Sequence, residues 1–136
     1  MIRVLFFLAV LTITVKAEVI SMVNCNNKSW PSGTIQYVYY TINLKTNNVK
    51  IDNQFYKKDN NVVKNYRIIS GNVENGIVTE QLPIMDKDGK ITAQSSSYIL
   101  YPRKSFVQWN YFVNGHFQEE HSTKNGRTDC ERVVLN

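Results

Sequence analysis

The stretch YFVNGHFQEEH, residues 111–121, contains both histidines of the chain and two adjacent glutamates. Such side chains can ligate a metal ion or exchange protons when they converge on one point. The Asn114-Gly115 pair instead predicts a tight β-turn, because both residue types tolerate the positive φ angles of short hairpin loops. Phe106 to Val113 and His116 to Thr123 are then expected to be the two strands of a hairpin.

Strand geometry argues against chemistry in this hairpin. Side chains alternate between the two faces of a strand, so His116 and His121 are expected to point to opposite sides. The neighbours Glu119 and Glu120 are expected to diverge for the same reason. The spacing also differs from the zinc motifs in which two histidines share one face of a helix. The sequence therefore predicts no metal site and no acid–base pair here.

Other motifs are equally weak as catalytic sites. Residues 86–89 (DKDG) begin like a calcium loop but lack the later glutamate and the flanking helices, so a turn is expected. Residues 95–97 (SSS) offer hydroxyls without a G-x-S-x-G motif or a nearby histidine. We therefore expect no cofactor, no metal and no enzymatic activity. A site assembled from carboxylates on distant strands remains the alternative.

The first seventeen residues, MIRVLFFLAVLTITVKA, have the pattern of a secretory signal peptide. Arg3 precedes an apolar stretch of about 12 residues, which is shorter than the ~20 that a membrane span needs. An N-terminal membrane anchor is the alternative. We expect residues 18–136 to form a single all-β domain that is secreted or periplasmic and has no membrane span after signal cleavage.

The two cysteines, Cys25 and Cys130, lie near opposite ends of this expected domain. An exported protein meets oxidising conditions, in which an even number of cysteines favours a disulfide. The prediction is one bridge that joins the first and last strands. Two free thiols or an intermolecular bridge are the alternatives.

The body of the sequence predicts an all-β fold, a small antiparallel sandwich or barrel of about 7–9 strands. Short runs rich in β-branched and aromatic residues alternate with turn signals, and all six glycines fall between such runs. The expected strands are 34–44, a continuation from Val49, 61–70, 76–82, 90–101, 106–113, 116–123 and 128–135. Asn27-Lys28-Ser29 is a glycosylation sequon that matters only in a eukaryotic source.

The net charge of +5 comes from 16 basic and 11 acidic side chains, and the lysines are scattered through the sequence and form no single cluster. A basic lobe can attract nucleic acid or an acidic glycan, whereas scattered lysines favour a solvated face. Because an exported protein does not meet nucleic acid, we expect a protein or a glycan as partner. We also expect the protein to be a monomer.

Aromatic residues supply the remaining candidate site. Tyrosine and tryptophan offer a large contact area with a polar group at one end, which suits the stacking of sugars or peptides. The alternative is that they form the core and the cross-strand pairs of a small β-domain. The candidate binding surface comprises Tyr37, Tyr39, Tyr98, Tyr101, Trp109 and Tyr111.

The layout of a signal, an early cysteine, a β-rich body and a late cysteine is similar to that of the periplasmic lysozyme inhibitors, small disulfide-clasped β-barrels. This resemblance covers architecture only, and it assigns no site residue. The primary hypothesis is an exported, non-catalytic protein that binds a polysaccharide or a protein partner in the envelope or outside the cell. The alternative is an inhibitor of an envelope-directed enzyme such as lysozyme, although the positive charge disfavours a basic lysozyme as target.

Overall fold

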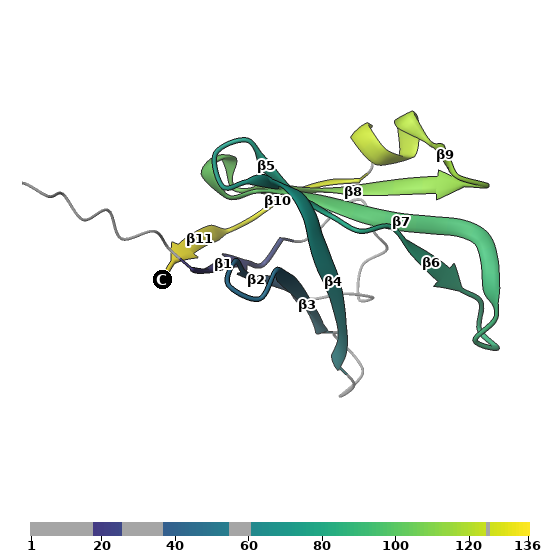
Figure 1. The fold of residues 1–136 in the computed structure, drawn as a ribbon, viewed down its shortest axis with the longest axis horizontal. Coiled ribbons are helices and arrows are strands. Elements are labelled where there is room, and N and C mark those ends of the chain that lie inside the picture. Colours follow the sequence, from purple (N-terminus) through teal and green to yellow (C-terminus); the bar gives the residue numbers. More distant parts are fainter. Residues whose placement is uncertain (1–17, 26–36, 55–60, 125) are drawn as a thin grey trace, which may run out of the picture.

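The computed structural model describes residues 18–25, 37–54, 61–124 and 126–136, and the expected signal peptide and the Asn27 sequon lie outside these ranges. The described residues form eleven strands in one antiparallel sheet that does not close into a barrel (Figure 1). The strands are β1 (Val19–Val23), β2 (Tyr37–Asn43), β3 (Asn48–Gln54), β4 (Asn61–Asn72), β5 (Gly76–Thr79), β6 (Leu82–Met85), β7 (Ile91–Tyr101), β8 (Phe106–Val113), β9 (His116–Phe117), β10 (Arg127–Asp129) and β11 (Arg132–Leu135).

The predicted all-β fold with one disulfide is confirmed. The described strands outnumber the expected seven to nine because two expected strands are each divided and β1 was not among the expected runs. The run 76–82 is split between β5 and β6, and the run 128–135 is split at Cys130 between β10 and β11. Within the described ranges, no helix has the length and apolar character needed to cross a membrane.

Strand β4 divides the sheet into two halves. Its first part, Asn61–Arg67, pairs with β3, and its last part, from Ile68 to Asn72, pairs with β5. A register shift between Ile68 and Ser70 inserts one extra residue, a β-bulge that bends the strand. One half is therefore β11-β1-β2-β3-β4, and the other is β4-β5-β7-β8-β10 with β6 on β7 and β9 on β8.

The core follows from alternation along the strands. In β2 the buried residues are every second one, and they align with buried residues on β1 and β3. Ile20, Ile42, Val49 and Tyr66 form one continuous row across four strands. Ile77, Leu100 and Val107 contribute the core side chains of the other half. Burying aliphatic side chains of this size stabilises by about 1.5–3 kcal/mol each.

Three tyrosines pack between the two halves. Tyr98 on β7 contacts Tyr40 at 5.7 Å and Tyr66 at 5.1 Å between ring centroids, in both cases edge to face. The Tyr66 hydroxyl shares a hydrogen bond of 3.4 Å with Ser96 Oγ. Burial raises the pKa of Tyr40 and of Tyr98, and each shift is increased by the neighbouring tyrosines. Burial also raises the pKa of Tyr66, against the lowering effect of the Ser96 hydrogen bond.

Residues 116–123 were expected to be one strand, and this expectation is wrong. Strand β9 comprises only His116 and Phe117, and Glu120–Lys124 forms one π-helical turn. The hairpin register itself is confirmed, because Val113 pairs with His116 and Phe112 with Phe117. The alternation argument fails for Glu119, Glu120 and His121, since these residues lie beyond the strand.

Strand β9 ends after Phe117 because other groups bond to the edge of β8 beyond that point. The Tyr111 N–H donates to Ser122 Oγ, and the Trp109 N–H donates to the Gly126 carbonyl, so these groups replace a longer β9. A Cβ on Gly126 would lie 2.2 Å from the Trp109 carbonyl oxygen and 2.4 Å from that of Ser122. Only glycine allows this close approach.

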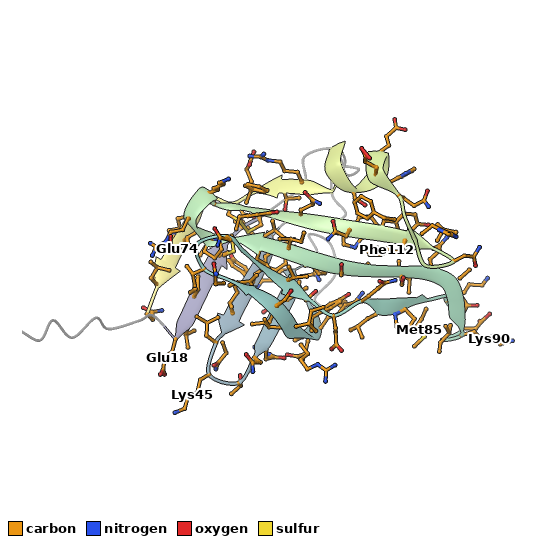
Figure 2. All side chains as sticks on the ribbon, turned by 45° about the horizontal axis from the view of Figure 1, so that its top comes forward. Glu18, Lys45, Glu74, Met85, Lys90 and Phe112 are labelled. Carbon is orange, nitrogen blue, oxygen red and sulfur yellow. A yellow bond between two sulfur atoms is a disulfide. The ribbon has the colours of Figure 1, made fainter. Side chains whose placement is uncertain are left out.

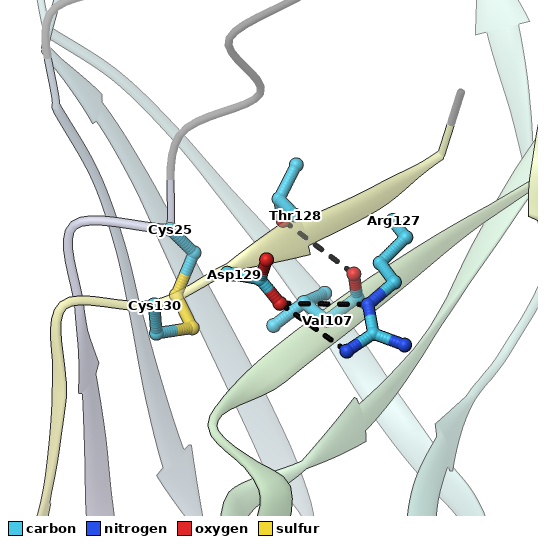
Figure 3. A network of polar contacts seen from close by, with 6 residues as sticks. All are labelled: Cys25, Val107, Arg127, Thr128, Asp129 and Cys130. Atoms are coloured by element: carbon cyan, nitrogen blue, oxygen red, sulfur yellow. Dashed lines mark hydrogen bonds and ion pairs between the residues drawn. A yellow bond between two sulfur atoms is a disulfide. The ribbon is translucent and has the colours of Figure 1, made fainter. Parts of the chain in front are cut away.

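The disulfide between Cys25 and Cys130 holds the chain where it passes from β10 to β11 (Figure 3). Cys25 follows β1, and the Cys130 N–H donates to the Ser105 carbonyl in the other half of the sheet. The chain thus passes between the two halves of the sheet at two places, within β4 and between β10 and β11, and the disulfide holds the second of them.

Replacing both cysteines by serine is expected to lower the free energy of unfolding. The bridge closes a sequence separation of 105 residues, for which the chain-entropy model gives up to about 4.7 kcal/mol. Urea denaturation followed by circular dichroism measures the loss, and reduced wild-type protein is the control. An unchanged midpoint in both samples would contradict the role given to the bridge.

The buried tyrosines predict a loss of stability at alkaline pH. Because folding raises their pKa values above the ordinary value near 10, stability is fully present below about pH 10 and falls as the pH rises through the folded-state values. The measurement is the free energy of unfolding between pH 8 and 11.5, with Tyr98→Phe expected to reduce the slope above pH 10. Ionisation of every tyrosine near pH 10 in the folded protein, followed by tyrosinate absorbance, would refute this.

Candidate binding face on strands β2 and β3

Tyr37 and Tyr39 lie on the outer face of the sheet, away from the core. Val38, Tyr40 and Ile42 alternate with them along β2 and are buried on the inner face. The two rings are stacked with centroids 6.2 Å apart and planes 23° from parallel. Both side chains keep part of their surface exposed, so they form an aromatic pair that a ligand can reach.

Strand β3 places polar side chains beside these rings. Gln54 is directly opposite Tyr37, Asp52 is opposite Tyr39, and Lys50 is one pair further along, opposite Thr41. Side chains that are paired directly across an antiparallel sheet have Cβ atoms about 4.5–5.5 Å apart. We call this set the tyrosine face, and its members are Tyr37, Tyr39, Lys50, Asp52 and Gln54.

Asp52 has an unsatisfied oxygen on this face. Its Oδ1 is buried and has no hydrogen-bond partner among the described residues. A buried acceptor without a partner costs about 1–3 kcal/mol, so the position is unfavourable unless a further group satisfies it. A hydroxyl or amide donor of a ligand would do so.

The face can bind through stacking and hydrogen bonds. Lys50 is exposed and carries a positive charge, while Asp52 and Gln54 are partly buried acceptors or donors with restricted freedom. Within the described residues, no group of three or more His, Cys, Asp or Glu side chains is placed to hold a metal ion.

The structure distributes the six aromatic residues of the sequence prediction over several places. Tyr37 and Tyr39 lie together on the tyrosine face, and Tyr98 is in the tyrosine cluster of the core. Tyr101 stacks on Phe106 with ring centroids 4.4 Å apart.

Trp109 and Tyr111 form a second stacked pair on β8. Their ring centroids are 5.3 Å apart, and Tyr111 lies 5.8 Å from the His121 ring of the π-helical turn. Trp109 is directly across from Tyr98 on β7, which links this pair to the core. Both rings are partly exposed. This pair has no unsatisfied polar atom beside it among the described residues, unlike the tyrosine face.

Sequence reasoning did not identify Lys50, Asp52 and Gln54 as site residues. A signal was present, because NVKIDNQ alternates buried Val49 and Ile51 with polar side chains. The pairing with β2 depends on the turn, in which Asn43 Oδ1 accepts hydrogen bonds from the Lys45 and Thr46 N–H groups. That turn determines which polar residue meets which tyrosine.

Comparison with protein-family models, with curated proteins and with solved structures finds no match to this chain. The face is therefore interpreted from its own geometry.

Asp52→Asn is expected to leave stability unchanged or to raise it by up to about 1 kcal/mol, because an amide oxygen is less costly to bury unpaired than a carboxylate oxygen. Urea denaturation measures the change, with Asp129→Asn as the control for an exposed, ion-paired aspartate. If Asp52→Asn lowers stability more than the control does, then the Asp52 carboxylate stabilises the fold and its burial is not a cost.

Proposed function

We propose that this chain is an exported, non-catalytic binding protein that holds a polysaccharide on the tyrosine face. The observation that carries the proposal is the stacked pair Tyr37 and Tyr39 beside the unsatisfied Asp52 Oδ1. This combination offers an aromatic surface and a hydrogen-bond acceptor that no described residue uses.

The chemistry of a sugar matches both features. A pyranose ring has apolar C–H faces that pack against aromatic rings, and its rim carries hydroxyls that donate and accept hydrogen bonds. Asp52 would accept from a hydroxyl, and Gln54 and Lys50 would donate to ring or hydroxyl oxygens. Successive rings along one strand suit a chain of sugars better than a single small molecule.

The disulfide supports an extracytoplasmic location for this function. Disulfides persist in the periplasm and outside the cell, where envelope and matrix polysaccharides occur, and they are rare in the cytosol. The N-terminal signal pattern favours the same location.

The test is retention of the protein on insoluble polysaccharides, with peptidoglycan sacculi, chitin and an insoluble glucan as probes. We expect at least one to retain the wild-type protein. Tyr37→Ala and Tyr39→Ala are each expected to weaken retention about 2- to 12-fold, the equivalent of roughly 0.5–1.5 kcal/mol for an aromatic contact. Asp52→Asn should weaken it as well without loss of stability.

Trp109→Ala and Tyr111→Ala are the matched controls, because they remove a stacked aromatic pair from the other half of the sheet. Retention that is absent on all probes, or that falls equally in the controls, refutes binding at the tyrosine face.

The alternative, an inhibitor of an envelope-directed enzyme, is favoured by the β6–β7 hairpin. This hairpin projects away from β1–β3, and Met85 and Lys90 mark its end (Figure 2). Its polar tip is ordered by Asp86, whose Oδ1 accepts from the Asp88 and Lys90 N–H groups. Inhibition of a lytic enzyme that is lost in Asp86→Ala and kept in Tyr39→Ala would select this alternative.

A further inference from the structure

The first part of β4 has an unpaired edge. Asn61–Arg67 pairs with β3 on one side, and none of the described strands pairs with its other side. Strand β5 begins to pair only at Ile68, just before the bulge. The exposed edge thus adjoins the tyrosine face, because Val63 is directly opposite Asp52.

The contacts of Arg67 show which N–H and C=O groups of β4 point away from β3. Its N–H donates to Glu80 Oε1 at 3.0 Å, and its carbonyl accepts from the Glu80 N–H at 2.8 Å. Glu80 follows β5, so the Arg67 groups point away from β3. Because these groups alternate in direction along a strand, Val63 and Asn65 also direct their N–H and C=O groups to the unpaired side. Val62, Lys64 and Tyr66 direct theirs toward β3.

Other strand edges in the described structure are shorter or blocked. Strands β9, β10 and β11 have two, three and four residues, and β6 carries Pro83, which has no N–H to donate. The first part of β4 offers residues 61–66 without a proline, since the outward groups of Arg67 are bonded to Glu80. Its side chains are also accessible, with Val62 38% and Val63 48% exposed.

We propose that an extended, acidic segment of a partner protein adds to this edge of β4 as a further strand. The free N–H and C=O groups of Val63 and Asn65 match the backbone of an extended peptide, as in other cases of strand addition. Val62 and Val63 point to opposite faces of the sheet and would contact apolar side chains of the added strand.

Charge specifies the acidic character of the segment. Lys64 projects on the inner face, and Lys50 projects on the outer face directly opposite Asn65. Both lysines are exposed, and neither forms an ion pair within the described part of the chain. An acidic side chain on the inner face of an added strand would therefore lie beside Lys64 of β4, and one on the outer face would approach Lys50 of β3 across Asn65.

A lysine on an edge strand can also prevent unwanted pairing. The two roles differ in what they predict: a protective lysine leaves the edge unpaired at any peptide concentration, whereas a recognition lysine strengthens pairing with an acidic strand. Reversing its charge distinguishes them.

The experiment uses the full mature chain and a capped synthetic peptide in which Thr or Val alternates with Glu over eight residues. Amide hydrogen exchange is followed by NMR. The Val63 and Asn65 amides are expected to exchange quickly in the free protein and at least tenfold more slowly with saturating peptide. Lys64→Glu is expected to weaken binding, and a peptide N-methylated at alternate residues should not bind.

Val63→Pro provides the sharpest variant, because it removes an outward N–H and leaves the ladder to β3 intact. We expect about tenfold weaker peptide binding, whereas Val63→Ala, which keeps the N–H, should bind nearly as the wild type. Circular dichroism checks that both variants fold.

Absence of peptide protection in the wild-type protein, or equal binding by Val63→Pro and Val63→Ala, overturns the proposal. Protection of the same amides in protein alone that grows with protein concentration also overturns it, since a second copy would then occupy the edge. Polysaccharide retention on the tyrosine face does not depend on these results, so the two proposals can fail separately.

Discussion

The change of partner along β4 is the constraint on which the rest of the structure depends. Up to Arg67 the strand pairs with β3, and from Ile68, just before the bulge at Ile69, it pairs with β5. The bulge redirects the chain, so Tyr66 on one half packs against Tyr98 on the other. The change of partner also leaves one side of the first part of β4 without a paired strand among the described residues. Core packing and this edge thus both depend on where β4 passes from β3 to β5.

The second crossing between the halves differs from the first in its chemistry. Where β4 is continuous and relies on backbone pairing, the passage from β10 to β11 consists of two residues, Cys130 and Glu131. Around it, Arg127 lies 3.8 Å from the centroid of the Phe106 ring and pairs with Asp129 at 3.4 Å. These exposed contacts contribute little stability individually. The covalent bond to Cys25 is therefore the main restraint at this crossing.

The sequence was most informative where one local rule decides the structure. The Asn114-Gly115 turn has φ angles of 51° and 79°, as the dipeptide predicts, and the cysteines form the predicted bridge. It was least informative where side chains replace backbone partners. Nothing in residues 118–124 shows that Ser122 will satisfy the Tyr111 N–H, because that contact depends on where β8 and Gly126 come together in space.

The candidate site illustrates the same limit. Tyr37 and Tyr39 were recognisable as aromatic residues two apart, but the sequence did not separate them from Tyr98, which lies in the core. The distinction requires knowing which face of β2 meets the other half of the sheet. Asp52 was not recognisable as a site residue, because its partner on β2 is set by the length of the turn at residues 44–47.

The position of the tyrosine face favours binding without rearrangement. Seven consecutive residue pairs join β2 to β3, and the inner faces of both strands are fixed by the buried row from Ile20 to Tyr66. Ring positions on the outer face are therefore set before a ligand arrives, which reduces the entropy lost on binding. The flexible member is Lys50, an exposed long side chain on β3 that pairs with Thr41 on one side and Asn65 on the other. It can adjust to a ligand on the tyrosine face while the rings stay in place.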